Sequence, residues 1–362
     1  MGKYKYDESV MITRADGSKK RIRVRGNDEA EVKEKIALIK LQDKAGLITF
    51  NNNTPFERWA DEWLNTYKKP NIEKGTYIEI KGIMDRFFIP YIGKMSIGDI
   101  KLPHIQKCLN NMEGYSKSYV RRAQLYIKGC FQKAWEAEMI NRSPCIGLEQ
   151  PKTAQKIDRR PLTGEELRYF MEAIQTHHKG AFFGILYACG IRPGEARALT
   201  WFNINMEKKT LTVTQAFAEK SNEIKPPKTE AGKRTIPIPD WYMEILKQIP
   251  RTDCPYVFHT NKGNPIDSNR CNITWKTLLR EMEIKAGAKL YRNKIIMYSG
   301  VIGQDLTPYN LRHTYATELV KKGVDIKTAQ YLLGHSDIRV TMNIYAHVTE
   351  DMIETARDKI NA

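Results

Sequence analysis

The chain has 362 residues, 41% of them hydrophobic, which is enough for two or three domains with real cores. The 59 Lys and Arg against 42 Asp and Glu give a net charge of +17, which favours a polyanionic partner, nucleic acid above all, over a merely basic surface. No run is apolar enough to span a bilayer, and the six cysteines lack metal-binding spacing. We therefore expect a cytoplasmic protein without metal or disulfides.

The first predicted element is a β-hairpin over residues 9–26, SVMITRADGSKKRIRVRG, with ADGS as its turn. Three arginines of its second strand alternate with aliphatic residues, and a period of two places their guanidiniums on one face. These arginines are Arg21, Arg23 and Arg25. We interpret the face as DNA-binding, and the alternative is a solvated strand edge blunted by charge. A helix follows over residues 27–44, capped by Asn27 or Asp28.

From residue 54 the pattern is helical to about residue 147, with Thr54 as predicted cap and Pro55 at the first helical position. The aromatic residues that follow at helical spacing predict a core rather than a base-stacking surface. A long predicted helix over residues 116–140 carries basic residues that we expect to contact DNA. They are Lys117, Arg121 and Arg122. Residues 141–161 are rich in proline and charge, which indicates a linker.

The remaining region mixes helix and strand. Thr163 and Glu166 form a capping box at the start of one helix, and a later apolar helix ends at Gly190. The alternating segments KKTLTVTQ and KRTIPIP predict strands around the loop IKPPKTEAG, and residues 288–306 predict an inserted loop or hairpin. The predicted fold class is multidomain α+β. It combines a small sheet-plus-helix domain, an all-α domain and a mainly helical domain with a small antiparallel sheet.

Four short motifs of the last region hold residues that could act on a phosphodiester. CGIRPGEARAL holds Arg192 and Glu195, KPPKTEAGKRTIPIP holds Lys228, TPYNLRHTYATEL holds Arg312 and His313, and LLGHSDIRVTMNIYAHV holds His335 and Tyr345. Cleavage of a phosphodiester needs a nucleophile, neutralisation of the phosphate oxygens and a proton for the leaving oxygen. A guanidinium grips two oxygens, lysine can give up its proton, and tyrosine can attack phosphorus and form a covalent ester. No carboxylate cage for a metal stands in these motifs.

Each residue alone also has an ordinary structural explanation. Arg192 could pair with Glu195, Lys228 could be a solvated turn lysine, and Arg312 and His313 could be helix-start residues. The histidine after Gly334 could cap a helix, and Tyr345 could fill a core. Only the joint order and spacing of the motifs favour a site.

The order Arg, Lys, Arg, Gly-His, Tyr resembles that of the tyrosine recombinase (phage integrase) family, across the whole last region. The first two regions resemble domains of phage and conjugative-transposon integrases. The resemblance implies an arm-type DNA-binding domain over 1–50, a helical core-binding domain over 54–147 and a catalytic domain over 160–362. It further implies a site-specific recombinase that integrates or excises a mobile element and needs no metal, ATP or other cofactor. Its partners would be double-stranded core and arm sites, a homotetramer on DNA, and accessory DNA-bending or excision factors.

The resemblance also implies the role of each motif residue. Tyr345 would attack the scissile phosphate and form a 3′-phosphotyrosyl linkage, while Arg192 and Arg312 clamp the non-bridging oxygens. Lys228 would protonate the 5′ leaving oxygen, and His335 would donate a hydrogen bond to the phosphate. Two further residues would orient the site residues without binding the phosphate themselves. They are Glu195, which would orient Arg192 or a neighbouring histidine, and His313.

One position departs from the family pattern. The family usually has histidine three residues before the second arginine, and this chain has Tyr309 there. A phenol of ordinary pKa, about 10, is a poor base at neutral pH, although it can donate a hydrogen bond to phosphate. The group that accepts the proton of Tyr345 is therefore left open. A second hypothesis is a DNA-binding regulator with weakened catalysis, and a third, disfavoured by the cationic sheet, is a relaxing topoisomerase.

Overall fold

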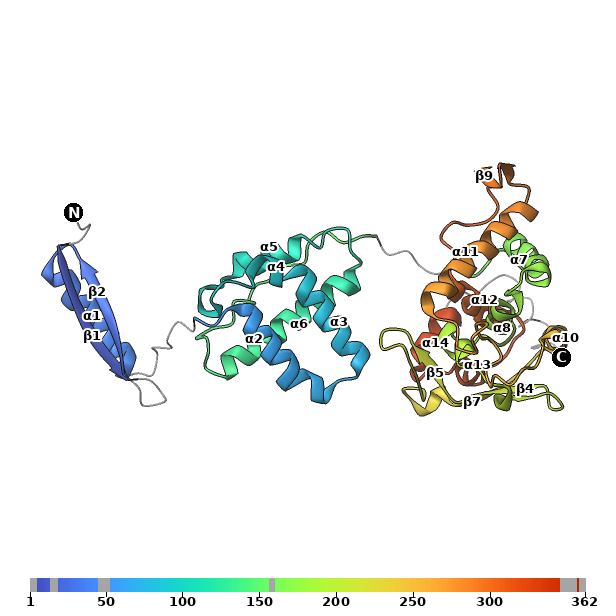
Figure 1. The fold of residues 1–362 in the computed structure, drawn as a ribbon, viewed down its shortest axis with the longest axis horizontal. Coiled ribbons are helices and arrows are strands. Elements are labelled where there is room, and N and C mark those ends of the chain that lie inside the picture. The colour runs from blue at the N-terminus through green and yellow to red at the C-terminus, as the bar shows by residue number, and fades with distance from the viewer. Residues whose placement is uncertain (1–4, 14–18, 45–52, 156–159, 346–356, 358–362) are drawn as a thin grey trace. The chain divides into compact units, whose positions relative to one another are not determined.

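The computed structural model describes residues 5–13, 19–44, 53–155, 160–345 and 357 (Figure 1). They belong to two compact units, Met1–Lys156 and Ile157–Ala362. Helices predominate in both units, and the strands form small antiparallel sheets. The predicted α+β fold class is confirmed.

The first unit begins with an antiparallel pair backed by a helix. Strands β1 (Tyr6–Thr13) and β2 (Lys19–Gly26) pair, and helix α1 (Glu29–Lys44) packs on them through Val10, Val24 and Val32. Successive side chains of a strand point to opposite faces of the sheet, and the buried valines of both strands share the face that α1 covers. Asp28 caps α1 by accepting from the backbone N–H of Glu31 at 2.7 Å. The predicted turn ADGS lies outside the described residues.

The rest of the first unit is helical. Its elements are α2 (Phe56–Glu62), a π-helical segment (Trp63–Lys68), a 3-10 turn (Lys69–Asn71), α3 (Lys74–Phe87), α4 (Ile89–Ile92), a 3-10 turn (Ile97–Asp99), α5 (Leu102–Asn110) and α6 (Lys117–Glu136). Phe56, Trp59 and Trp63 are buried as predicted, whereas Tyr67 is 37% exposed. The prediction that Thr54 caps this helix and that Pro55 is its first residue is wrong by one position. Pro55 is itself the N-cap, and α2 begins at Phe56.

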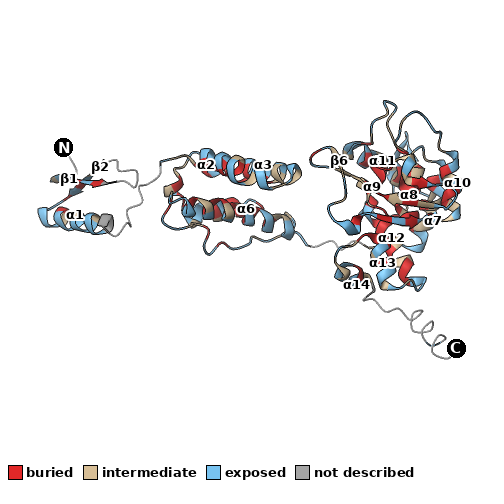
Figure 2. Cartoon of the chain, turned by 90° about the horizontal axis from the view of Figure 1, so that it is seen from below, coloured by how far each residue is buried: buried red, intermediate tan, exposed pale blue. Residues whose placement is uncertain are grey.

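The second unit surrounds a buried helix. Its helices are α7 (Gly164–Thr176), α8 (Gly180–Cys189), α9 (Pro193–Arg197), α10 (Asp240–Gln248), α11 (Ser268–Lys285), α12 (Pro308–Lys321), α13 (Ile326–Leu333) and α14 (Ile338–Tyr345). Helix α8 is apolar on all sides and contacts α7, α10 and α12 (Figure 2). It ends at Gly190, which adopts φ +61° as a left-handed C-cap.

Three small sheets complete this unit. Strands β3 (Ile204–Asn205), β4 (Thr210–Val213) and β7 (Arg234–Pro237) form one antiparallel sheet in that order. Strands β5 (Ala216–Ala218) and β6 (Glu223–Lys225) form a second, and β8 (Lys289–Tyr291) and β9 (Lys294–Met297) a third. The predicted segment 288–306 therefore contains a hairpin, formed by β8 and β9, and the residues after Met297 carry no strand. The hairpin's turn residues Arg292 and Asn293 both have positive φ, which suits the right-handed twist of the strands.

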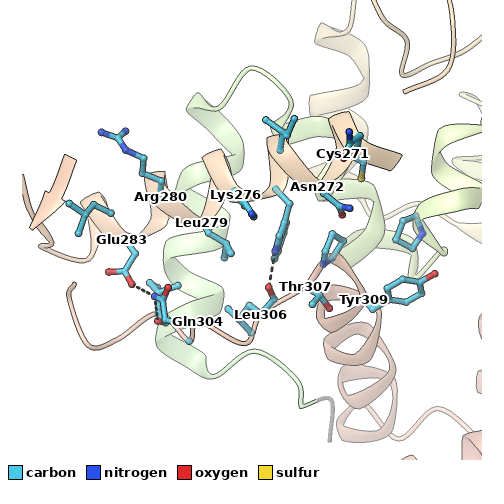
Figure 3. Close-up of a pocket in the computed structure, with 18 of the residues that line it drawn as sticks. Cys271, Asn272, Lys276, Leu279, Arg280, Glu283, Gln304, Leu306, Thr307 and Tyr309 are labelled. Carbon is cyan, nitrogen blue, oxygen red and sulfur yellow. Dashed lines mark hydrogen bonds between the residues drawn. The ribbon is translucent and has the colours of Figure 1, made fainter. Parts of the chain in front are cut away.

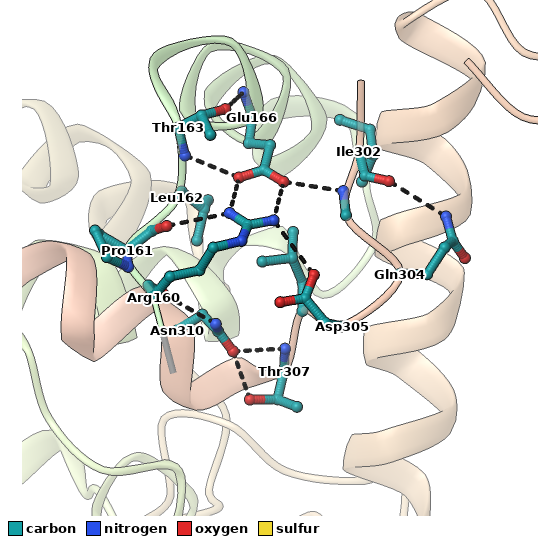
Figure 4. Close-up of polar contacts among 12 residues, drawn as sticks. Arg160, Pro161, Leu162, Thr163, Glu166, Ile302, Gln304, Asp305, Thr307 and Asn310 are labelled. Atoms are coloured by element: carbon teal, nitrogen blue, oxygen red, sulfur yellow. Dashed lines mark hydrogen bonds and ion pairs between the residues drawn. The ribbon is translucent and has the colours of Figure 1, made fainter. Parts of the chain in front are cut away.

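The start of this unit is fastened to helix α12 by a polar cluster (Figure 4). The predicted capping box of Thr163 and Glu166 is present, and Arg160 grips the same carboxylate at 2.6 and 2.7 Å. The Asn310 side chain donates to the Arg160 carbonyl at 3.0 Å. Because Asn310 lies in the first turn of α12, these bonds fix the helix that carries Tyr309 and the second motif arginine.

Candidate active site

The first motif places an arginine and a glutamate at the start of a short helix. Arg192 is the N-cap of α9, and the Glu195 carboxylate accepts from its backbone N–H and from its Nη1, both at 2.8 Å. Glu195 is 4% exposed, whereas the Arg192 side chain keeps 38% of its surface in solvent. The buried carboxylate therefore holds a guanidinium that remains partly open to a ligand.

The second motif arginine, Arg312, is almost fully buried on α12. Its Nη1 donates to the Gly190 carbonyl at 2.5 Å, and its Nη2 donates to the Leu333 carbonyl and to Nε2 of His335, the latter at 3.0 Å. Burial, followed by repulsion from Arg192, lowers the pKa of Arg312 to about 9. The guanidinium thus stays charged at neutral pH.

The histidine of the last motif is neutral and held in one tautomer. Arginine can only donate, so Nε2 of His335 accepts from Arg312, and Nδ1 carries the proton toward Thr341 Oγ1 at 2.9 Å. Burial, and then the charges of Arg312 and Arg192, lower the pKa of His335 to about 4. Thr341 is fully buried on α14, so this bond also anchors the helix that ends at Tyr345.

Three successive backbone carbonyls at the C-terminal end of α13 each accept from a different arginine. Leu332 O accepts from Arg234 Nε at 2.8 Å, Leu333 O accepts from Arg312 Nη2, and Gly334 O accepts from Arg192 Nη2 at 3.1 Å. Such carbonyls have no partner within the helix and carry its negative dipole end. The helix end thus gathers three guanidiniums, which come from three other elements, at one place.

One of the three, Arg234, was not predicted from the sequence. It lies on β7, is 2% exposed, and binds both carboxylate oxygens of Glu195 at 3.2 and 2.9 Å. A signal for it does exist in KRTIPIP, because Arg234 is in phase with the buried Ile236 and Ile238. An arginine at a buried strand position needs a carboxylate partner, and here that partner is Glu195.

Other predicted site residues lie around this cluster. Lys228 is exposed in the turn between β6 and β7. Tyr345 is the last residue of α14, and the structure describes its backbone only. His313 follows Arg312 on α12, and its buried Nδ1 has no hydrogen-bond partner among the described residues. The cluster therefore contains the arginines, His335 and Glu195, with Glu195 bound to arginines and not to a histidine.

Tyr309 lies one turn before Arg312 and is 36% exposed. It borders a cavity of about 1010 Å³ that extends between α11 and the segment leading into α12 (Figure 3). Asn272 and Lys276 of α11 line one side, and Leu306 lies on the other. The residue that departs from the family pattern thus borders this cavity, one helical turn before Arg312.

The residues predicted to bind DNA lie in the first unit. The side chains of the three hairpin arginines share the exposed face of β2, but Asp7 on β1 pairs with Arg23 at 2.7 Å and with Arg25 at 3.1 Å, so part of the positive charge is neutralised. Arg21 donates to Ser9. On α6, Lys117 and Arg121 are exposed, whereas Arg122 pairs with Glu79 of α3. DNA binding by these residues stays a prediction.

No three His, Cys, Asp or Glu side chains among the described residues gather as metal ligands. None of the described helices is long and apolar enough to cross a membrane.

Comparison with known proteins agrees with the geometry. Residues 160–352 match the phage integrase family, and residues 55–112 match the N-terminal SAM-like domain of phage integrases. A tyrosine recombinase XerC-like protein of Caldanaerobacter subterraneus subsp. tengcongensis is 28% identical over 338 residues, covering 84% of this chain and 81% of the relative. The transposase from transposon Tn916 of Enterococcus faecalis is 24% identical over 315 residues, covering 81% and 75%.

Solved structures show the same fold. The Tn1549 transposon integrase in complex with transposon right end DNA aligns with TM-score 0.64 at 20% identity, over 85% of this chain and 100% of that one. A lambda integrase tetramer bound to a Holliday junction aligns with TM-score 0.59 at 17% identity, over 90% and 95%. The family match alone covers more than half of the chain. The chain belongs to the phage integrase family and is a tyrosine-type site-specific DNA recombinase.

Proposed function

We propose that this recombinase cleaves and rejoins DNA through a covalent 3′-phosphotyrosyl intermediate at Tyr345. The phenolate oxygen of Tyr345 attacks phosphorus, the bond to the 5′ oxygen breaks, and Lys228 gives that oxygen its proton. Arg192 and Arg312 bind the non-bridging oxygens, where negative charge grows in the transition state.

The observation that carries the proposal is the convergence of Arg192 and Arg312 at the end of α13. Their guanidiniums are already held by carbonyls and a carboxylate, so little reorganisation is needed when charge develops. Thr341, which binds His335 in this cluster, lies four residues before Tyr345. In a helix this spacing puts both positions on one face, which supports Tyr345 as the nucleophile.

For His335 the contacts favour a role other than direct donation to the phosphate. Its Nε2 accepts from Arg312, and with a pKa of about 4 the ring does not take a second proton at neutral pH. We therefore propose that His335 orients Arg312, which then binds the phosphate. Tyr309, which stands where the family has histidine, would donate a hydrogen bond to the phosphate.

The partners follow from the same proposal. We infer that the chain binds core sites through the helical part of the first unit and arm sites through the β1–β2 sheet. We also infer that it assembles as a tetramer to integrate or excise a mobile element, as its relatives' names suggest. Accessory DNA-bending or excision factors would act on this assembly.

The test is trapping of the covalent intermediate. A nicked duplex carrying the candidate site is incubated with the protein and resolved on a denaturing gel, where wild-type protein should give a protein–DNA band. Tyr345→Phe should bind the duplex equally and give no band. Wild-type protein that binds the site but never becomes linked to it would instead support the DNA-binding regulator on the same scaffold.

A further inference from the structure

The buried arginine of β7 contacts three segments that surround the proposed site. Arg234 donates Nε to Leu332 O at the end of α13, both Nη groups to Glu195 of α9, and Nη1 to Gly232 O at 3.1 Å. Gly232 in turn packs against Pro227, because a Cβ on this glycine would lie 2.4 Å from the Pro227 Cβ. Pro227 directly precedes Lys228.

We propose that Arg234 is a positioning residue of the recombination reaction, which neutralises Glu195 so that Arg192 keeps its positive charge for the phosphate. This inference rests on the proposed function. A single buried carboxylate beside Arg192 would cancel the charge of that arginine. Because Glu195 is shared with Arg234, three guanidiniums face one carboxylate and one neutral histidine, and two positive charges remain for the phosphate oxygens.

The pKa of Glu195 agrees with the sharing of its carboxylate between Arg234 and Arg192. Burial alone raises the pKa of its carboxyl, but the hydrogen bonds and charge of Arg234, and then the charge of Arg192, lower it to about 2. Arg234 donates to both carboxylate oxygens, whereas the Arg192 side chain donates to Oε1. Glu195 is therefore mainly the counterion of Arg234, while Arg192 remains 38% exposed and able to turn to another anion.

Arg234 cannot touch the DNA itself, because its side chain has no exposed surface and its contacts are to protein. Its effect must pass through Glu195 and the two backbone carbonyls. Loss of the arginine should therefore slow cleavage without weakening DNA binding, which depends on exposed cations.

The experiment is a double-mutant cycle on the full-length protein. We compare wild-type protein with Arg234→Met, Glu195→Gln and the double variant. Single-turnover formation of the covalent band is measured at saturating DNA, together with DNA affinity and thermal unfolding. Arg168→Met, which removes an exposed arginine paired with Glu172 on α7, is the matched control and should behave as wild type.

Arg234→Met should slow cleavage by about 10²-fold, as does loss of one preorganised donor, at unchanged affinity. The double variant also removes the carboxylate, so the positive charge of Arg192 is no longer cancelled. Its cleavage rate should be at least about 10-fold higher than that of Arg234→Met. A packing role alone would make the double variant as slow or slower, and that result overturns the proposal. So does an Arg234→Met protein that cleaves at the wild-type rate.

If Arg234→Met does not fold, the double variant decides, because it lacks the unpaired buried carboxylate that destabilises the single variant. The double variant should then cleave within about 10-fold of wild type, and cleavage about 10²-fold or more below wild type overturns the proposal. The proposed function has a separate outcome. Wild-type protein that forms no covalent band refutes the chemistry at Tyr345, whatever the Arg234 variants do.

Discussion

Substitution of Gly334 by alanine adds one methyl group next to the arginine cluster and so tests the geometry of that cluster. Gly334 adopts φ +63°, and a Cβ there would lie 2.8 Å from Arg234 Nη1 and 3.0 Å from the Ala231 carbonyl. Its own carbonyl accepts from Arg192. Gly334→Ala should therefore strain the backbone, push Arg234 away and move the carbonyl that holds Arg192.

The left-handed backbone alone costs about 1–2 kcal/mol for a residue with a Cβ. Gly287→Ala is a matched control, because Gly287 also follows a helix, has φ +95°, and has no atom within 4 Å of a Cβ. Both variants should unfold about 2–8 °C lower, since each kcal/mol shifts the midpoint by about 2–4 °C in a unit of this size.

Only Gly334→Ala should also lose catalysis, by about 10- to 10²-fold in the rate of the covalent band, because one preorganised donor is misplaced. The assay is the single-turnover cleavage described above, at a temperature where both variants are folded. Equal cleavage by Gly334→Ala and Gly287→Ala would refute the reasoning. It would mean that the close approach of Arg234 and Gly334 does not set the position of Arg192.

Three further predictions concern the neighbours of these arginines. Thr341→Val should slow cleavage by about 10-fold at unchanged DNA affinity, because Nδ1 of His335 loses its acceptor. Thr341→Ser keeps a hydroxyl acceptor and should cleave at the wild-type rate. Equal rates for the wild type and both variants would contradict the assigned tautomer of His335. Because the folded-state pKa of His335 is about 4 against an ordinary 6.5, the unfolded chain takes up the proton first. Stability should therefore fall as pH drops from 6.5 to 4, and His335→Asn should flatten that part of a melting-temperature profile, which an unchanged slope would disprove. Tyr309→His should cleave at the wild-type rate or faster, and a severe loss would show that the site is adapted to tyrosine.

The sequence predicted those parts of the fold in which a local pattern, such as alternation along a strand or a helix cap, determines the structure. The alternation in the hairpin placed Arg21, Arg23 and Arg25 on one face, and the capping box at Thr163 appeared where expected. The pairing of Asp7 with two of these arginines was missed, because it depends on strand register. Register decides which residues of the two strands stand opposite each other, and the alternation within one strand does not state it.

The candidate site was predictable only in part, for a physical reason. Motif order drew attention to Arg192, Arg312 and His335, which the structure brings together. The groups that gather them are backbone carbonyls, which every residue has and no sequence pattern marks. Arg234 was missed although its strand phase marked it as buried, because strand alternation was used to assign β7 and not to ask which side chain pointed inward.

The short helix α13 imposes a rule on how this segment of the chain can vary. Each residue added to or removed from an α-helix rotates everything beyond it by about 100° and shifts it by about 1.5 Å. One insertion or deletion between Ile326 and Leu333 would therefore turn all three acceptor oxygens away from their partners at once. Replacements on its outer side, such as at the exposed Lys327, leave the oxygens in place. Variants of this enzyme should accept many changes of residue in α13 but no change in its length.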